Sequence, residues 1–141
     1  MQRTDVAVIG AGQCGLAMSA ELSQAGVDHL VLEKGPSAGH RWKTERWDSL
    51  RLLTPNWMNH LAGARYSGGA AHGYETARAF AARFDVAVAE LAPPLLTDAA
   101  VSSLTGAQGN YLLKTNRGPI AARAVVMANG ACADVRIPPM A

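Results

Sequence analysis

The sequence lacks the features that mark membrane insertion, export or binding to nucleic acid. Charged residues make up 17% of the 141 residues, and the net charge at pH 7 is +2. The 13 lysines and arginines are scattered singly, so no basic stripe predicts nucleic acid as a partner. No apolar run approaches the roughly 20 residues of a membrane-spanning helix. The apolar run Val6–Ile9 is also too short for a secretion signal.

Cysteine and metal-ligand clusters are equally scarce. Cys14 and Cys132 do not make a disulfide framework, and we expect reduced thiols in a cytoplasmic protein. No Cys-x-x-Cys pair exists, which excludes disulfide exchange of the thioredoxin-reductase type. The histidines are not spaced like metal ligands, and we expect all four to be solvated or capping residues. They are His29, His40, His60 and His72.

The first third of the chain predicts a strand–loop–helix–strand unit. Thr4–Ile9 is typical of a short buried strand, and Gln13–Ala25 of a helix whose apolar residues recur at spacings of four and three. Gly26 stands where a left-handed helix cap belongs. Val27–Leu32 predicts a second buried strand that ends at Glu33. Such a unit joins parallel strands by a right-handed crossover.

The rest of the chain predicts an excursion, a helix and a β meander. Lys34–Leu61 shows no long hydrophobic period and is expected to be extended and ligand-facing. The chain is then expected to form a small-residue loop (Ala62–Gly73), a helix (Glu75–Phe84), a third strand (Val86–Val88) and a proline break (Pro93-Pro94). Three further β segments, separated by glycine-bearing turns, predict the meander. They are Ala99–Leu104, Asn110–Thr115 and Pro119–Ala128.

The loop after the first strand carries the glycine pattern of a dinucleotide site. Gly10 permits a tight turn, Gly12 removes a side chain that would block a phosphate, and Gly15 lets helix and strand pack closely. A pyrophosphate would accept backbone N–H bonds at the helix N-terminus. Three glycines alone would fit a glycine-rich turn, but here a strand precedes them and a helix follows, and Glu33 comes 18 residues after Gly15.

Two other residues of this unit have more than one interpretation. Glu33 is expected to accept hydrogen bonds from the ribose hydroxyls of an adenosine and to repel a 2′-phosphate, which disfavours NADP in this site. Its alternative is a solvated acid at a strand end. Cys14 lies at the helix N-terminus, a position that favours thiol reactivity, so a redox role stands beside the simpler interpretation of a reduced thiol.

Four segments together resemble the flavin-containing monooxygenase-like oxidoreductases. They are Val6–Glu33, Gly39–Trp42, Arg46–Pro55, and Val125–Gly130 with the following Ile137-Pro138. The resemblance implies an α/β, Rossmann-like FAD-binding domain with a parallel sheet and a small antiparallel meander. It implies FAD extended across the carboxyl ends of the strands, with a backbone amide near Val101 against the adenine.

The resemblance also implies a set of cofactor-binding residues. They are Gly10, Gly12, Gln13, Cys14, Gly15, Glu33, Lys34, Arg41, Trp42, Val101, Asn129 and Gly130. Trp42 fits cofactor contact and core packing equally, whereas core packing is favoured for Trp47. Arg51 is expected to pair with Asp48 rather than with phosphate. The sequence departs from the family at Asn129, where threonine is usual, and at Val135, where proline is usual, which makes the isoalloxazine end less predictable.

The resemblance predicts that the chain is one part of a larger enzyme. No second glycine motif follows Gly130, so residues 1–141 are expected to be an N-terminal FAD-binding domain without the NADPH domain and without the strand that completes the sheet. The alternative is a reduced descendant of such an enzyme, and the N-terminal piece is favoured. The implied function is an FAD-binding oxidoreductase of the monooxygenase type, NADPH-dependent at full length, with an unknown small-molecule substrate. The alternatives are a non-catalytic flavin-binding or interaction module and an NAD-dependent dehydrogenase, which the meander disfavours. Without the completing strand, Ala124–Ala128 would be an edge open to self-association.

Overall fold

A computed structural model describes residues 1–131 and 137–140. Its main sheet has six strands in the order β5-β2-β1-β8-β7-β6. The first four strands are parallel, and β8, β7 and β6 form an antiparallel meander. The strands are β1 (Gln2–Ile9), β2 (His29–Leu32), β5 (Leu95–Leu96), β6 (Val101–Ala107), β7 (Asn110–Thr115) and β8 (Gly118–Met127). The expected α/β fold with a parallel sheet and a meander is confirmed.

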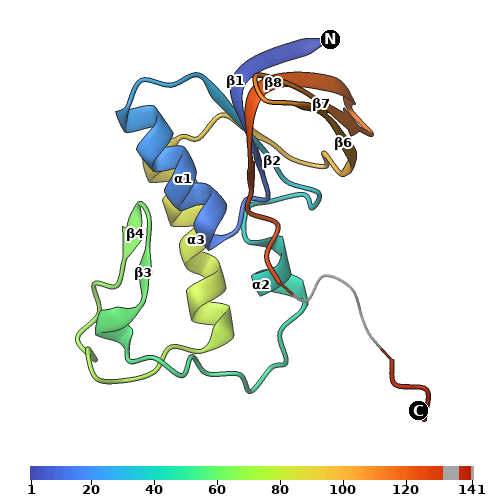
Figure 1. Cartoon of the computed structure of the whole chain (residues 1–141). Helices are drawn as coiled ribbons and strands as arrows, with labels where there is room; N and C mark the ends of the chain where they lie inside the picture. Colours follow the sequence, from blue (N-terminus) through green and yellow to red (C-terminus); the bar gives the residue numbers. More distant parts are fainter. Residues whose placement is uncertain (132–136, 141) are drawn as a thin grey trace.

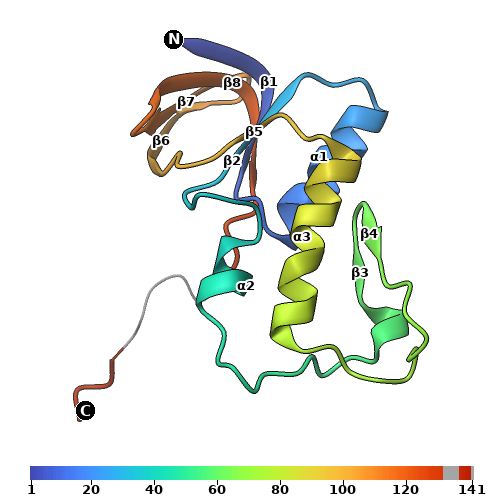
Figure 2. The ribbon, with the colours of Figure 1, turned by 180° about the vertical axis from the view of Figure 1, so that it is seen from behind.

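Two helices, α1 (Gln13–Gln24) and α3 (Ala77–Leu91), lie side by side on one face of the parallel strands (Figures 1 and 2). Successive side chains of a strand point to opposite faces, so β1 contributes to two cores. Val8 packs with Leu16 and Phe84 beneath the helices. Ala7 belongs to a second cluster with Leu113 and Ile120 of the meander. The short helix α2 (His40–Thr44) lies beyond the carboxyl ends of the parallel strands (Figure 1).

The third strand is not where the sequence predicts it. Residues 86–88 continue α3, because Phe84 and Ala87 are buried on the same helical face as Phe80. The helix ends at Leu91, and Ala92 adopts a left-handed conformation at φ 41° just before Pro93. The third parallel strand is β5, which follows the proline pair. The third strand of the parallel part of the sheet is therefore β5, beside β2, and not residues 86–88.

The excursion between β2 and α3 is more structured than the sequence predicts. Besides α2 it contains η1 (Asn56–Met58) and a small hairpin of β3 (His60–Leu61) and β4 (Ala64–Arg65), which falls partly in the expected loop. Arg83 of α3 fastens the hairpin. Its guanidinium donates to the carbonyls of Asn59 and Ala64 and pairs with Glu75 at 2.7 Å.

Three side chains contradict the sequence-based expectations. His29 is 7% exposed and is neither solvated nor a cap, since its Nε2 lies 2.7 Å from the Ser19 hydroxyl and its Nδ1 2.9 Å from the Val27 carbonyl. Trp47 is not a core residue, because 64% of it is exposed. The Arg51 guanidinium donates to the Tyr74 carbonyl at 2.9 Å, and the structure records no Arg51–Asp48 pair among the described residues.

Residues 1–131 and 137–140 contain neither a candidate membrane-spanning helix nor a cluster of metal-ligating side chains. No helix there is both long and apolar enough to cross a membrane. No group of three or more histidine, cysteine or acidic side chains there is arranged to hold a metal ion.

Candidate nucleotide-binding site

Two glycines of the loop after β1 are required by close backbone packing. Gly10 has φ 103°, and a Cβ built on it would stand 2.5 Å from the Ala128 carbonyl oxygen and 3.1 Å from the Cα of Asn129. A Cβ on Gly15 would stand 1.9 Å from the Gly10 carbonyl oxygen. Any larger residue at either position would push β1, α1 and the end of β8 apart.

Gly12 differs from both, because no contact among the described residues requires a glycine there. Its φ of −80° is open to any residue, and a Cβ built there would meet nothing within 4 Å. Gly12 is the N-cap of α1, and no side chain in the described part of the chain caps this helix end. Gly12 thus leaves room beside an uncapped helix N-terminus, where backbone N–H groups and the helix dipole favour a phosphate. The residues present fit a pyrophosphate at this position.

Glu33 lies at the end of β2 with both carboxylate oxygens bonded to backbone. Oε2 accepts the Ala11 N–H at 2.9 Å, and Oε1 accepts the Gly35 N–H at 2.8 Å. The residue is 7% exposed, so it is not the solvated strand-end acid of the alternative interpretation. An acceptor-only carboxylate here can also receive hydroxyl donors.

A group of charged side chains lies beside the same strand ends. The Arg41 Nη1 donates to the Ala131 carbonyl at 3.0 Å and lies 3.6 Å from where a Cβ of Gly130 would be. Arg41 Nε also donates to Glu45 at 2.6 Å. This hydrogen bond is the main cause that lowers the pKa of Glu45, with smaller contributions from the charges of Lys34 and Arg46. Arg41 and Lys34 thus place positive charge around Glu45, and Arg41 lies beside Gly130.

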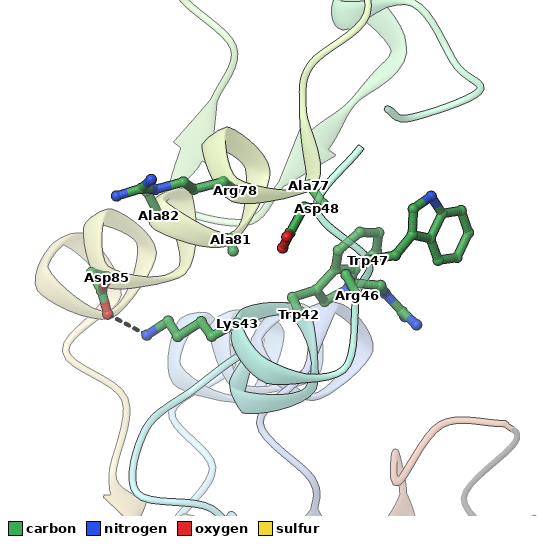
Figure 3. A pocket seen from close by; sticks show the side chains of 10 residues that line it. All are labelled: Trp42, Lys43, Arg46, Trp47, Asp48, Ala77, Arg78, Ala81, Ala82 and Asp85. Atoms are coloured by element: carbon green, nitrogen blue, oxygen red, sulfur yellow. Dashed lines mark hydrogen bonds and ion pairs between the residues drawn. The ribbon is translucent and has the colours of Figure 1, made fainter. Parts of the chain in front are cut away.

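Trp42 points elsewhere. Its ring packs edge-to-face on Phe80 at 4.7 Å, and the Arg46 guanidinium lies 4.5 Å above it. Together with Trp47 and Asp48 it lines a cavity of about 450 Å³ between α2 and α3 (Figure 3). This cavity includes no residue of the glycine loop. The packing of Trp42 is thus observed, and its contact with a cofactor stays a prediction.

The remaining candidates surround the loop. Gln13 Nε2 donates to the His60 carbonyl at 3.1 Å, which ties α1 to the excursion hairpin. Cys14 is a free, exposed thiol. Val101 opens β6 directly after Ala100, whose N–H is held by Asn116 Oδ1 at 2.8 Å. Val135 and Cys132 lie outside the described residues.

The carboxyl ends of β1, β2 and β8 therefore bring most of the predicted residues together. Gly10 adjoins Asn129, Arg41 adjoins Gly130, and Glu33 is joined to the loop through Ala11. Sequence reasoning missed the backbone partners of Glu33 and the pairing of Arg41 with Glu45. The Arg41–Glu45 pair could have been predicted from the sequence, since residues four apart on a helix lie side by side. The roles of these residues toward a ligand stay predictions.

Known proteins share this fold. A family model described as "Pyridine nucleotide-disulphide oxidoreductase" matches residues 7–138. The chain belongs to this family. One relative of the chain is a CzcO-like oxidoreductase of Geobacillus kaustophilus, which is 34% identical over 137 residues. The match covers 97% of the chain and 39% of the relative. A CzcO oxidoreductase of Bacillus subtilis is 31% identical over 95% of the chain and 38% of its own length.

A solved structure agrees with these relatives. The flavin-containing monooxygenase from Stenotrophomonas maltophilia superposes with a TM-score of 0.85 at 27% sequence identity, over 98% of this chain and 42% of that one. The resemblance drawn from the sequence is thereby confirmed. The chain spans about two fifths of the length of the proteins that it matches.

Proposed function

We propose that this chain is the FAD-binding domain of an NADPH-dependent oxidoreductase of the flavin monooxygenase type. One observation carries the proposal: among the described residues nothing fills the space beside Gly12, the N-cap of α1, and no side chain caps that helix end. The similarity to a flavin-containing monooxygenase supports the choice of FAD over other dinucleotides. Cytoplasmic location and the role of residues 1–141 as one domain of a longer enzyme belong to the same proposal.

The residues of the chain would hold the cofactor along the strand ends. The first-turn N–H groups of α1 would bind the pyrophosphate, with Arg41 and Lys34 contributing positive charge. Glu33 would accept hydrogen bonds from the adenosine ribose, and the backbone near Val101 would contact the adenine. Asn129 and Gly130 would lie toward the flavin end. Bound FAD would supply hydride acceptance from NADPH and the reaction with oxygen, while the protein would position the flavin and exclude water.

The first test is whether the purified chain binds FAD. Titration of the ligand-free protein with FAD should quench flavin fluorescence with a saturable curve, and a bound fraction should give the flavin absorbance spectrum. NADPH oxidation is then measured with the complete gene product. Absence of FAD binding would overturn the proposal. FAD binding without NADPH oxidation would favour a non-catalytic flavin-binding module instead.

A further inference from the structure

We propose that Glu33 holds the empty phosphate loop in its binding conformation, in addition to any contact with ribose. The proposal rests on the proposed function, since it concerns the same loop. It makes Glu33 a positioning residue for the pyrophosphate, a role that its place at the end of β2 does not reveal. The carboxylate therefore orders the phosphate loop before any ligand binds.

The two hydrogen bonds of the carboxylate carry this inference. Ala11 is fully buried, and its N–H donates to Glu33 Oε2 at 2.9 Å across 22 positions of sequence. Gly35 N–H donates to the other oxygen, Oε1, at 2.8 Å. Each oxygen thus receives one amide. An ionised acceptor strengthens such bonds, and a buried N–H left without an acceptor costs free energy.

The backbone of Glu33 extends this junction to the meander. Its N–H donates to the Leu96 carbonyl at 2.9 Å, and its carbonyl accepts the Ala99 N–H at 2.8 Å. The two segments that its side chain holds are also joined to other parts of the site. Ala11 O accepts the Gly39 N–H at 2.9 Å, just before α2, and Gly35 O accepts the Asp98 N–H at 3.0 Å. One residue therefore links the phosphate loop, the approach to α2 and the approach to β6.

A loop of this composition needs such a restraint. Gly10 and Gly12 give it more backbone freedom than other residues would, and that freedom must be lost when a phosphate binds. A loop that is already fixed binds its ligand more tightly, because the ordering cost is met during folding. Glu33 fixes it at Ala11, between the two glycines.

The ribose role and the loop role respond differently to glutamine. The ribose hydroxyls both donate and accept, so a glutamine amide can still bond them. The amides of Ala11 and Gly35 only donate, and glutamine offers a single carbonyl oxygen, with its NH₂ group facing the other N–H. Glu33→Gln should therefore spare ribose recognition and break one of the two restraints.

The decisive measurement is hydrogen–deuterium exchange of the ligand-free chain, resolved by residue. In the wild type, the amides of Ala11 and Gly35 should be protected. In Glu33→Gln at least one of them should exchange about tenfold faster or more, while the amides of β1 and α1 keep their protection. Glu90→Gln, an exposed acid on α3, is the control for the loss of one negative charge.

Ligand affinity provides the second readout. Glu33→Gln and Glu33→Ala should both weaken FAD by about 10- to 100-fold, the range for a lost bond to a charged acceptor. FMN, which has no adenosine, should be weakened in the same direction, whereas ribose recognition alone predicts no change for FMN. Glu90→Gln should leave both affinities unchanged.

Two results would overturn the inference. One is rapid exchange of Ala11 and Gly35 amides in the ligand-free wild type, which needs no variant to fold. The other is a Glu33→Gln protein with wild-type protection and wild-type affinity for FAD. Failure of the wild type to bind FAD would instead defeat the proposed function, and the exchange of the two amides would still decide the role of Glu33.

Discussion

Gly15 lies against the carbonyl of Gly10, so closely that a Cβ on Gly15 would stand 1.9 Å from that oxygen. Gly15→Ala should therefore destabilise the whole fold by about 1–3 kcal/mol or more, because β1 and α1 must separate to admit one methyl group. Urea unfolding of both proteins measures the difference. Gly12→Ala is the matched control, since its Cβ would enter open space, and it should cost little stability. Equal losses in the two variants would contradict the packing argument.

Gly12→Asp should abolish flavin binding while the fold remains formed. The carboxylate would occupy the place of the pyrophosphate and repel it, yet aspartate is a favourable N-cap for α1. The variant should keep its circular dichroism spectrum and its unfolding midpoint, or gain slightly in stability. Flavin content at the wild-type level in a natively folded Gly12→Asp protein would remove the phosphate-loop assignment.

Arg83→Met should be among the most destabilising changes outside the glycine loop. The Arg83 and Glu75 side chains are 12% and 9% exposed, and the change leaves the Glu75 carboxylate and two backbone carbonyls without their donor. Loss of one partner of a buried pair costs about 3–5 kcal/mol. Arg123→Met, which removes the exposed pair with Asp5, should cost about 0–1 kcal/mol. Similar unfolding midpoints for the two variants would contradict this account.

The Arg41–Glu45 pair predicts a small dependence of stability on pH. The hydrogen bond from Arg41 lowers the pKa of Glu45 below its ordinary value of 4.5. Because the pKa of Glu45 is lower in the folded state, the pair stabilises the fold fully at pH values above the ordinary pKa. This contribution is lost as the pH falls through the lowered pKa of the folded state. A carbon-13 NMR titration of the Glu45 carboxyl should show a midpoint below 4.5 that rises in Arg41→Gln. An unchanged midpoint in the variant would exclude Arg41 as the cause.

The sequence predicts those parts of the fold that local pattern determines. Glycine turns and strand periods locate the meander, and the loop from Gly10 to Gly15 locates the site. Residues 86–88 were assigned wrongly because their β-branched valines favour a strand, whereas burial of Phe84 and Ala87 maintains the helix. The bonds of Glu33 to Ala11 and Gly35 depend on how separate segments meet, so no spacing in the sequence predicts them.

Expressed alone, the chain should self-associate and should not oxidise NADPH. Strand β8 pairs with β1 as far as Met127 but with β7 only as far as Ala122, so residues 124–127 have one strand partner among the described residues. The open edge predicted from the sequence is thus limited to the side of residues 124–127 that faces away from β1. This stretch carries no charge and ends in Met127, which is 60% exposed. Uncharged open edges promote pairing with another chain.

Met127→Lys tests this edge directly, because a charge there should discourage pairing without disturbing the core, where Val125 and Val126 pack against the two clusters. Light scattering should show association of the wild type that falls in the variant, while Val86→Lys on the helix α3, an exposed apolar position away from any strand edge, serves as the control. Neither the wild type nor the Met127→Lys variant should consume NADPH, since these 141 residues contain no second glycine motif to bind that nucleotide. A wild-type monomer that turns over NADPH with saturable kinetics would contradict both the predicted self-association and the predicted lack of NADPH oxidation. It would mean that the Gly10–Gly15 loop serves a different nucleotide arrangement.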